Sequence, residues 1–152
     1  MTTKPSAQKM EQMVSAYFEA CGKQDPNAIA ACFAPGAVHY FPHIPPLIGG
    51  AALGAAIVGE LRNRGGHFFI DKIFSDVEQC AAAVEWSRTY LQPDRILRGY
   101  ELYEFDPTSM LIREIRGYYA SAPNADKARH EILDFDYEGR GYKTLASRSS
   151  PG

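Results

Sequence analysis

The sequence has few cysteines and no surplus of charge of either sign. Its three cysteines, Cys21, Cys32 and Cys80, are scattered among 152 residues and form no CxxC pair. An odd, scattered set is typical of reduced thiols, so we expect buried free cysteines and a cytoplasmic protein rather than a disulfide framework. Lys and Arg number 16 against 18 Asp and Glu, with no basic cluster. Nucleic acid is therefore not an expected partner.

Long apolar runs are also missing. The first residues, MTTKPSAQKMEQ, contain no apolar core of a signal peptide, and no stretch of about 18 apolar residues occurs. We therefore expect neither secretion nor contact with a membrane. Gly49-Gly50 is too short for a phosphate-binding loop, and no cofactor is expected. A hydrophobic content of 45% over this length predicts a single soluble domain.

What is present begins with helical patterns. Apolar residues recur every three or four positions over 6–24, which predicts an amphipathic helix with Ser6 as its N-cap. A second, shorter helix is predicted from Asp25-Pro26, an N-cap followed by proline at the first position, to a stop at Pro35-Gly36. A third, alanine-rich helix follows Gly49-Gly50 and ends at Gly65-Gly66.

The remaining pattern has a period of two residues. It predicts a short strand before a proline-rich loop and then four longer strands joined by turns, at 37–42, 67–74, 80–91, 96–105 and 111–120. Helices followed by an antiparallel meander predict an α+β fold rather than alternating βαβ units.

Two stretches carry a resemblance to a known family. They are YFEACGKQDPNAIAACFAPGAVHYFP and YELYEFDPTSMLIREIRGYYA, with Gly49-Gly50 opening the third helix between them. Together they resemble the NTF2-like superfamily, in its SnoaL-like and ketosteroid-isomerase-like branch. The resemblance implies three helices packed on a curved, mainly antiparallel sheet that forms a cone with an apolar pocket. It also implies a homodimer formed through the outer sheet face.

The resemblance covers about residues 8–120, so we expect an NTF2-like domain at 1–120 and a C-terminal extension at 121–152. The extension contains the aromatic residues Phe135, Tyr137 and Tyr142, which a disordered tail would not need. We expect it to pack on the domain or on a dimer partner and to line or cover the pocket, with only its last residues disordered.

Strand alternation predicts which side chains face the pocket. Glu101 shares a face with Gly99, Tyr103 and Phe105, and His39 shares one with Phe41. The predicted inward set of the neighbouring strands is Val84, Trp86, Arg88, Tyr90, Leu111, Arg113, Ile115, Gly117 and Tyr119.

Similarity to ketosteroid isomerase implies roles for three positions. Tyr17 falls where that family keeps the tyrosine of its oxyanion hole, and Glu101 falls where it keeps a protonated carboxylic acid. Phe41 falls where it keeps the general-base aspartate. Because phenylalanine cannot accept a proton, the usual steroid isomerisation is not expected. His39 is the nearest replacement base.

Two further enzymes of this fold suggest other chemistry. Limonene epoxide hydrolase uses an Asp-Arg-Asp set, and here an inward pair of Arg88 and Glu101 is expected, while Asp71 and Glu85 are expected to face outward. Scytalone dehydratase pairs tyrosines and histidines around a bound water. The tyrosines and histidines of this sequence that could do the same are Tyr17, His39, His43, Tyr103 and Tyr119.

The sequence thus supports two hypotheses. The first is a cofactor-free enzyme acting on a small, hydrophobic, oxygenated molecule as a dehydratase, isomerase, cyclase or hydrolase. The catalytic residues would be Glu101, His39, Tyr17 and Arg88, with Phe41, His43, Trp86, Tyr90, Tyr103 and Tyr119 binding substrate. The second is a ligand-binding protein without turnover. No metal site is expected, because a spacing of four residues on a strand separates His39 from His43 by about 13 Å.

Overall fold

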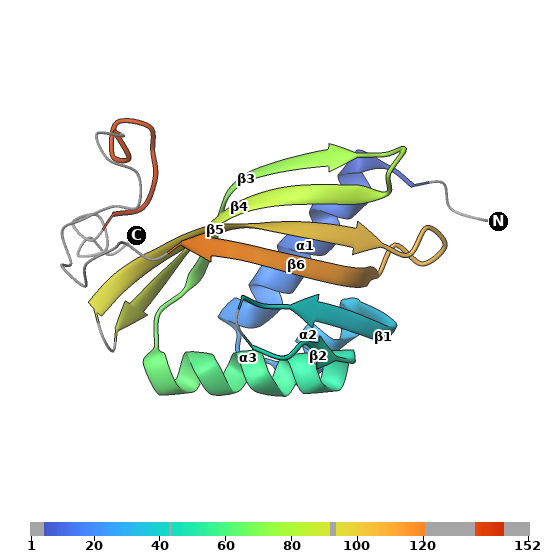
Figure 1. Cartoon of the computed structure of the whole chain (residues 1–152), viewed down its shortest axis with the longest axis horizontal. Helices are drawn as coiled ribbons and strands as arrows, with labels where there is room; N and C mark the ends of the chain where they lie inside the picture. The colour runs from blue at the N-terminus through green and yellow to red at the C-terminus, as the bar shows by residue number, and fades with distance from the viewer. Residues whose placement is uncertain (1–4, 43, 92–93, 121–135, 145–152) are drawn as a thin grey trace.

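The computed structural model describes residues 5–42, 44–91, 94–120 and 136–144 (Figure 1). The element order is two helices, two strands, a third helix and then four longer strands. The predicted α+β class is confirmed. None of the described helices has the length and apolar character needed to span a membrane.

The three helices begin where their capping residues predict. In α1 (Ala7–Gly22) the Ser6 hydroxyl accepts a hydrogen bond from the backbone amide of Lys9 at 3.2 Å. In α2 (Pro26–Ala31) the Asp25 carboxylate accepts from the amides of the first turn at 3.0 and 3.1 Å. These bonds satisfy donors that have no partner within the helix. The third helix, α3 (Gly50–Arg64), follows Gly49 in a left-handed conformation at φ 90°.

Six strands form one sheet in the order β2-β1-β6-β5-β4-β3. Their bounds are β1 Phe33–Tyr40, β2 Leu47–Ile48, β3 Phe68–Asp76, β4 Ala81–Leu91, β5 Asp94–Phe105 and β6 Ile112–Ala120. All neighbours are antiparallel except β1 and β6, which run parallel. The sheet is therefore mainly antiparallel, as predicted.

The start of β1 corrects the sequence prediction. Pro35-Gly36 was expected to stop the second helix, yet that helix ends at Ala31 and both residues lie inside a strand that begins at Phe33. The pairing of β1 with β6 shifts register between Phe33 and Val38, and Gly36 has a φ of 73°. A bulge tolerates both a missing N–H and a left-handed glycine, so these residues bend the strand without ending it.

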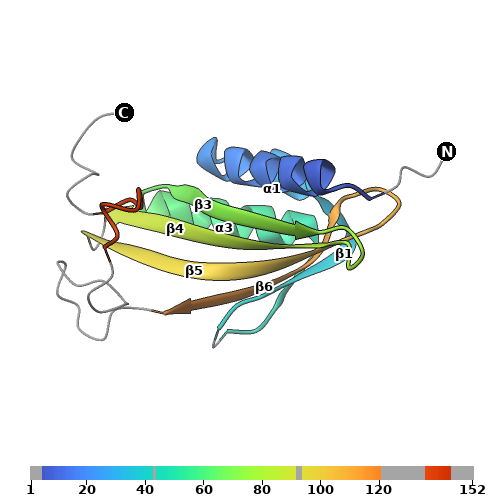
Figure 2. The same ribbon diagram turned by 90° about the horizontal axis from the view of Figure 1, so that it is seen from above.

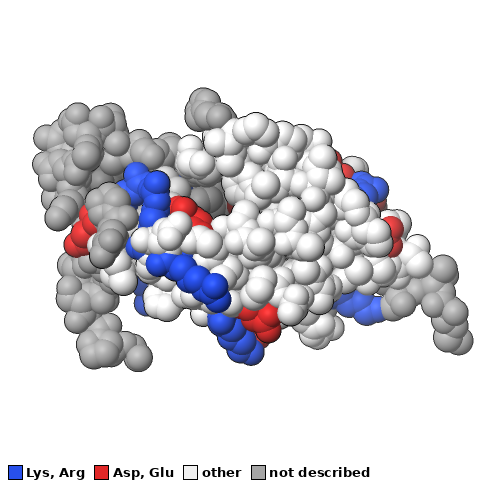
Figure 3. All heavy atoms as spheres, turned by 90° about the horizontal axis from the view of Figure 1, so that it is seen from below, with Lys and Arg blue, Asp and Glu red and all other residues white. Residues whose placement is uncertain are grey.

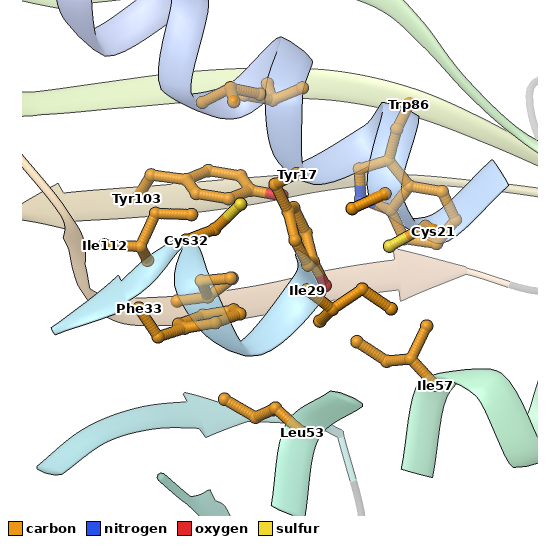
Figure 4. Packing of buried hydrophobic residues seen from close by; sticks show 14 of the residues in the cluster. Tyr17, Cys21, Ile29, Cys32, Phe33, Leu53, Ile57, Trp86, Tyr103 and Ile112 are labelled. Carbon is orange, nitrogen blue, oxygen red and sulfur yellow. The ribbon is translucent and has the colours of Figure 1, made fainter. Parts of the chain in front are cut away.

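The helices cover one face of the curved sheet (Figures 1 and 2). Between the two layers lies a buried cluster to which α1, α2, α3 and the inner face of the sheet all contribute. Figure 4 shows Tyr17 in the middle of this cluster, with Tyr103 on one side and Ile29 and Ile57 on the other. The inward sets predicted for β4 and β5 are confirmed, since Val84, Trp86, Arg88, Tyr90, Tyr103 and Phe105 are all buried.

The last strand departs from the predicted alternation at its start, where Leu111, predicted to face inward, is only half-buried and Ile112 is buried in its place. Arg113 was assigned to the inner face, but its side chain is 57% exposed and pairs with Glu104 at 2.7 Å. The cause is a register shift, because β5 pairs Glu104 with Glu114 and then Phe105 with Ile112, leaving Arg113 as the extra residue. Ile115 and Gly117 keep the predicted inner face.

The described part of the C-terminal extension, residues 136–144, packs on the outer face of the sheet. The Tyr142 hydroxyl donates to the Glu85 carboxylate at 2.6 Å, and the Arg98 guanidinium lies 4.2 Å from the ring centre of Tyr137. None of residues 136–144 lines the pocket. The expectation that they cover it is wrong for this segment, because its partners project from the opposite face of the sheet. Phe135 and the rest of the extension lie outside the described residues.

Candidate active site

A pocket of about 430 Å³ lies between the helices and the inner face of the sheet. Most of its wall is apolar, and four of its lining side chains carry charge, namely Glu60, Arg64, Arg88 and Glu101. The apolar and aromatic part of the lining consists of Tyr17, Phe18, Cys21, Phe41, Ile44, Leu47, Ala56, Ile57, Phe68, Trp86, Tyr90, Leu97 and Tyr119. A concave, apolar cavity with a few polar groups is the usual form of a small-molecule site.

Glu101 is the carboxylate in the inner part of this pocket. It projects inward from the middle of β5, and its side chain is 12% exposed. The Tyr103 hydroxyl donates to Glu101 Oε2 at 2.5 Å, and Glu101 Oε1 lies 3.4 Å from His39 Nε2. The residue opposite Glu101 on β6 is Gly117, which has no side chain to fill the space beside the carboxylate.

His39 lies behind Phe41 rather than in the pocket wall. Its side chain is 2% exposed, and its ring stacks on that of Phe41 at 3.8 Å between centres and 20° between planes. The 3.4 Å approach to Glu101 is within ion-pair distance, but neither ring nitrogen makes an aligned hydrogen bond to a described residue. Because Phe41 lines the pocket and His39 does not, His39 reaches a ligand only through Glu101.

Two buried tyrosines flank the carboxylate, and burial raises the pKa of both phenols well above the usual value. For Tyr17 the further causes are the neighbouring Cys21 thiol and the charge of Glu101, and for Tyr103 the second cause is Glu101. Their ring centres are 6.2 Å apart. Both hydroxyls therefore stay protonated at any physiological pH and act as hydrogen-bond donors. Tyr17 lines the pocket, whereas Tyr103 holds Glu101.

Arg88 also lines the pocket, but the expected pair with Glu101 does not form. Its Nη1 lies 3.5 Å from Glu60 Oε1 on α3, and its guanidinium lies against the rings of Phe68 and Tyr90, at 4.8 and 4.0 Å from their centres. The register explains the difference: Glu101 pairs with Val84, and Arg88 is four residues further along β4, about 13 Å at the usual strand rise. Burial lowers the pKa of the guanidinium.

Glu60 is a pocket residue that the sequence reasoning missed. It follows Ile57 by three residues and precedes Arg64 by four, so the helical period places all three on the face of α3 that lines the pocket. That spacing was visible in the sequence. What was not visible was that this face of α3 meets the end of β4 where Arg88 lies.

Asp71 and Glu85 line no part of the pocket, in agreement with their predicted outward orientation. Asp71 accepts a hydrogen bond from Ser87, and Glu85 accepts one from Tyr142. The carboxylate-arginine-carboxylate set expected of an epoxide hydrolase is therefore not assembled around Arg88 and Glu101.

The wall between the two charged ends is aromatic. Trp86 on β4 and Tyr119 on β6 meet edge to face at 6.1 Å across β5. They can meet because Gly99, paired with both, has no side chain between them. Tyr90, Trp86, Phe41 and Tyr119, all predicted to bind substrate, line the pocket. His43, also predicted, lies outside the described residues.

Among the described residues, no three His, Cys, Asp or Glu side chains gather closely enough to hold a metal ion. Figure 3 shows the molecule from the side of α3, where several basic groups lie in a line on one half of this face with acidic groups beside them.

Comparison with known proteins identifies the family. Residues 14–114 match the SnoaL-like domain. The chain belongs to the SnoaL-like family. The resemblance inferred from the sequence is thus confirmed. No match was found among curated proteins.

Solved structures extend the likeness to the whole SnoaL-like chain. A protein of unknown function with a cystatin-like fold from Methylobium petroleophilum PM1 is 37% identical, with 99% of this chain and 98% of that one covered and a TM-score of 0.75. A proposed ketosteroid isomerase from Kribbella flavida DSM 17836 is 15% identical, with 88% and 93% covered and a TM-score of 0.68. A proposed polyketide cyclase from Xanthomonas campestris pv. campestris is 21% identical, with 74% and 91% covered and a TM-score of 0.58.

The last two likenesses show the fold, and membership of the family supports a role as a cofactor-free enzyme or a small-ligand-binding protein. A more specific function has to be inferred from the residues in the pocket.

Proposed function

We propose that this SnoaL-like protein is an enzyme that moves protons on a small, hydrophobic, oxygenated substrate without a cofactor. The observation that carries the proposal is the placement of Glu101: a carboxylate lining an apolar pocket, fixed by the Tyr103 hydroxyl at 2.5 Å. A carboxyl group held in one orientation beside a bound substrate is suited to general acid–base catalysis. The likeness to proposed isomerases and cyclases of this fold agrees with such chemistry.

The reaction we infer starts with removal of a proton from a carbon next to a carbonyl group. Glu101 accepts the proton, and the electron pair of the broken C–H bond forms a C=C bond while negative charge develops on the carbonyl oxygen. The Tyr17 hydroxyl, protonated and in the same pocket, donates a hydrogen bond to that oxygen. In a substrate with a β,γ C=C bond, return of the proton to the γ carbon gives isomerisation. In a substrate with a β-hydroxyl group, the C–O bond breaks, the proton passes to the departing hydroxyl and water is released.

Tyr103 and His39 support Glu101 without touching the substrate. Tyr103 holds one carboxylate oxygen, and His39, 3.4 Å from the other, can exchange a proton with Glu101 or stabilise its charge. In this proposal both are positioning residues. Arg88 lies at the other end of the pocket and takes no part in the proton transfer.

The test is exchange of substrate hydrogen in heavy water, which detects proton removal without knowledge of the product. A panel of cyclic and aromatic ketones and hydroxyketones is incubated with the protein and followed by proton NMR. We expect catalysed exchange for at least one member and a loss of about a hundredfold or more in Glu101→Gln. Glu104→Gln on the outer face of the same strand is the matched control and should retain the activity. Absence of exchange across the panel, or an active Glu101→Gln, would refute the proposal.

The second candidate is a ligand-binding protein without turnover. Phe41 favours it, because the resemblance to ketosteroid isomerase implies a general base at this position, and phenylalanine, stacked here on His39, cannot accept a proton. Panel members that bind with micromolar affinity but exchange no hydrogen would support this candidate.

A further inference from the structure

Three buried donor nitrogens on the β4 wall of the pocket have no hydrogen-bond partner among the described residues. They are Nε and Nη2 of Arg88 and Nε1 of Trp86. Both residues are on the inner face of β4, two positions apart, and both line the pocket. Since native structures pair nearly all buried polar groups, and leaving one unpaired is destabilising, these donors call for an acceptor.

The surroundings of Arg88 restrict the direction from which an acceptor can approach. The rings of Phe68 and Tyr90 lie against the guanidinium, with Cζ 4.8 and 4.0 Å from their centres. Glu60 engages only Nη1, at a long 3.5 Å, and also lies 3.3 Å from Arg64 Nε. The donors left over therefore lie in the plane of the guanidinium, which is the geometry that a planar carboxylate matches with two parallel hydrogen bonds.

The charge balance at the Arg88 end of the pocket favours a single negative charge. Arg88 and Arg64 contribute two positive charges to the pocket lining, and Glu60 contributes one negative charge. One carboxylate completes the balance. At the other end of the pocket, the carboxylate of Glu101 would repel an anion. One oxygen of that carboxylate already accepts a hydrogen bond from Tyr103.

We propose that the ligand of this pocket is an organic carboxylic acid whose carboxylate binds Arg88, with the Trp86 indole N–H donating to one of its oxygens or to a neighbouring oxygen. Its apolar body lies along the wall formed by Trp86, Tyr119 and Leu97, towards Glu101. Binding of the acid does not depend on catalysis. The inference rests on the proposed function only where it identifies this ligand as the substrate. The carboxylate then fixes the molecule at one end while proton transfer occurs at the other.

The test compares acids with neutral molecules of the same shape. Binding of cinnamate and cinnamamide, and of biphenylacetate and biphenylacetamide, is measured by calorimetry on the intact chain. We expect each acid to bind about tenfold to a hundredfold more tightly than its amide, the range for hydrogen bonds to charged groups. In Arg88→Met the preference should disappear, and in Arg88→Lys part of it should return. Arg113→Met, an arginine on the outer face, should retain it fully.

The wild-type comparison tests the proposal even where Arg88→Met does not fold, because it requires no variant. A second readout is the NMR signal of the Arg88 Nε–H, assigned by its loss in Arg88→Lys, which should shift with the acids and not with the amides. Equal binding of acids and amides, no binding by either acid, or a preference that survives in Arg88→Met would overturn the inference. In Glu101→Gln the preference for acids should persist, so loss of exchange and loss of acid binding separate the two proposals.

Discussion

The prediction that follows most directly from the geometry concerns Gly99. A Cβ atom built on Gly99 would lie 2.5 Å from the backbone oxygen of Tyr118, 2.7 Å from Cβ of Tyr119 and 2.9 Å from Cζ2 of Trp86. The first of these neighbours is fixed in the β5–β6 ladder and the third is a buried ring. The substitution Gly99→Ala must therefore move the sheet backbone or the Trp86 ring.

Overpacking of this kind costs about 1–3 kcal/mol of unfolding free energy. For a domain of this size that corresponds to a fall of about 3–10 °C in melting temperature. Gly117→Ala is the matched control, because Gly117 lies on the same face one strand over and its nearest neighbour would be 3.5 Å from the new Cβ, an ordinary contact. Adding a methyl group there should change stability by less than about 1 kcal/mol.

Thermal and urea unfolding of the three proteins, followed by circular dichroism, measure this difference. Trp86 is the only tryptophan of the chain, so its fluorescence reports the same site, and its spectrum should change in Gly99→Ala and not in Gly117→Ala. Equal stability of the two variants would refute the reasoning. It would mean that Trp86 and Tyr119 can stay in contact even when residue 99 carries a side chain.

Three further predictions concern the carboxylate, a pocket thiol and the extension. Tyr103→Phe should lower the rate of hydrogen exchange while leaving ligand affinity within about threefold, because it removes only the bond that holds Glu101; an unchanged rate would contradict this role. Burial raises the pKa of the Cys21 thiol from 9.0 to about 12, so the folded state favours the protonated thiol. The contribution of this thiol to the stability of the fold is therefore complete below pH 9 and is lost as the pH rises towards 12. Alkylation of Cys21 at pH 9, read by peptide mass spectrometry, should therefore be slow until the protein unfolds, and rapid modification of the folded protein would contradict it. Tyr142→Phe removes the hydrogen bond to Glu85 and should lower the unfolding free energy by about 1 kcal/mol without affecting ligand binding; a change in affinity would place the extension at the pocket.

Local patterns predicted the helices and the faces of the central strands well. Ser6 and Asp25 form the expected caps, because capping depends on residues within one helical turn. Strand alternation placed Trp86, Arg88 and Glu101 on the inner face, since a period of two fixes the face of every residue in a regular strand. The pattern failed at Arg113, where a bulge inserts an extra residue and the alternation changes phase. It also failed at Pro35-Gly36, which were expected to stop a helix but lie in an irregular part of β1.

Partners across the site could not be predicted in the same way. Arg88 and Glu101 share a face, yet the strand register places them four residues apart along the sheet, and Arg88 instead meets Glu60 from α3. His39 was expected in the pocket because it shares a face with Phe41. The side chain of Phe41, just after the end of β1, stacks on His39 and lines the pocket in its place.

The sequence by itself determined the α+β class and the inward orientation of a glutamate and an arginine, because these follow from periodicity and capping, which act over a few residues. Its motifs carried the resemblance to the family. Only the tertiary structure decided that the two charges lie at opposite ends of one pocket, with Tyr103 and His39 beside the first and Glu60 beside the second. The reason is that these contacts depend on strand register and on the placement of α3 against the sheet, and both are set by the packing of the whole core.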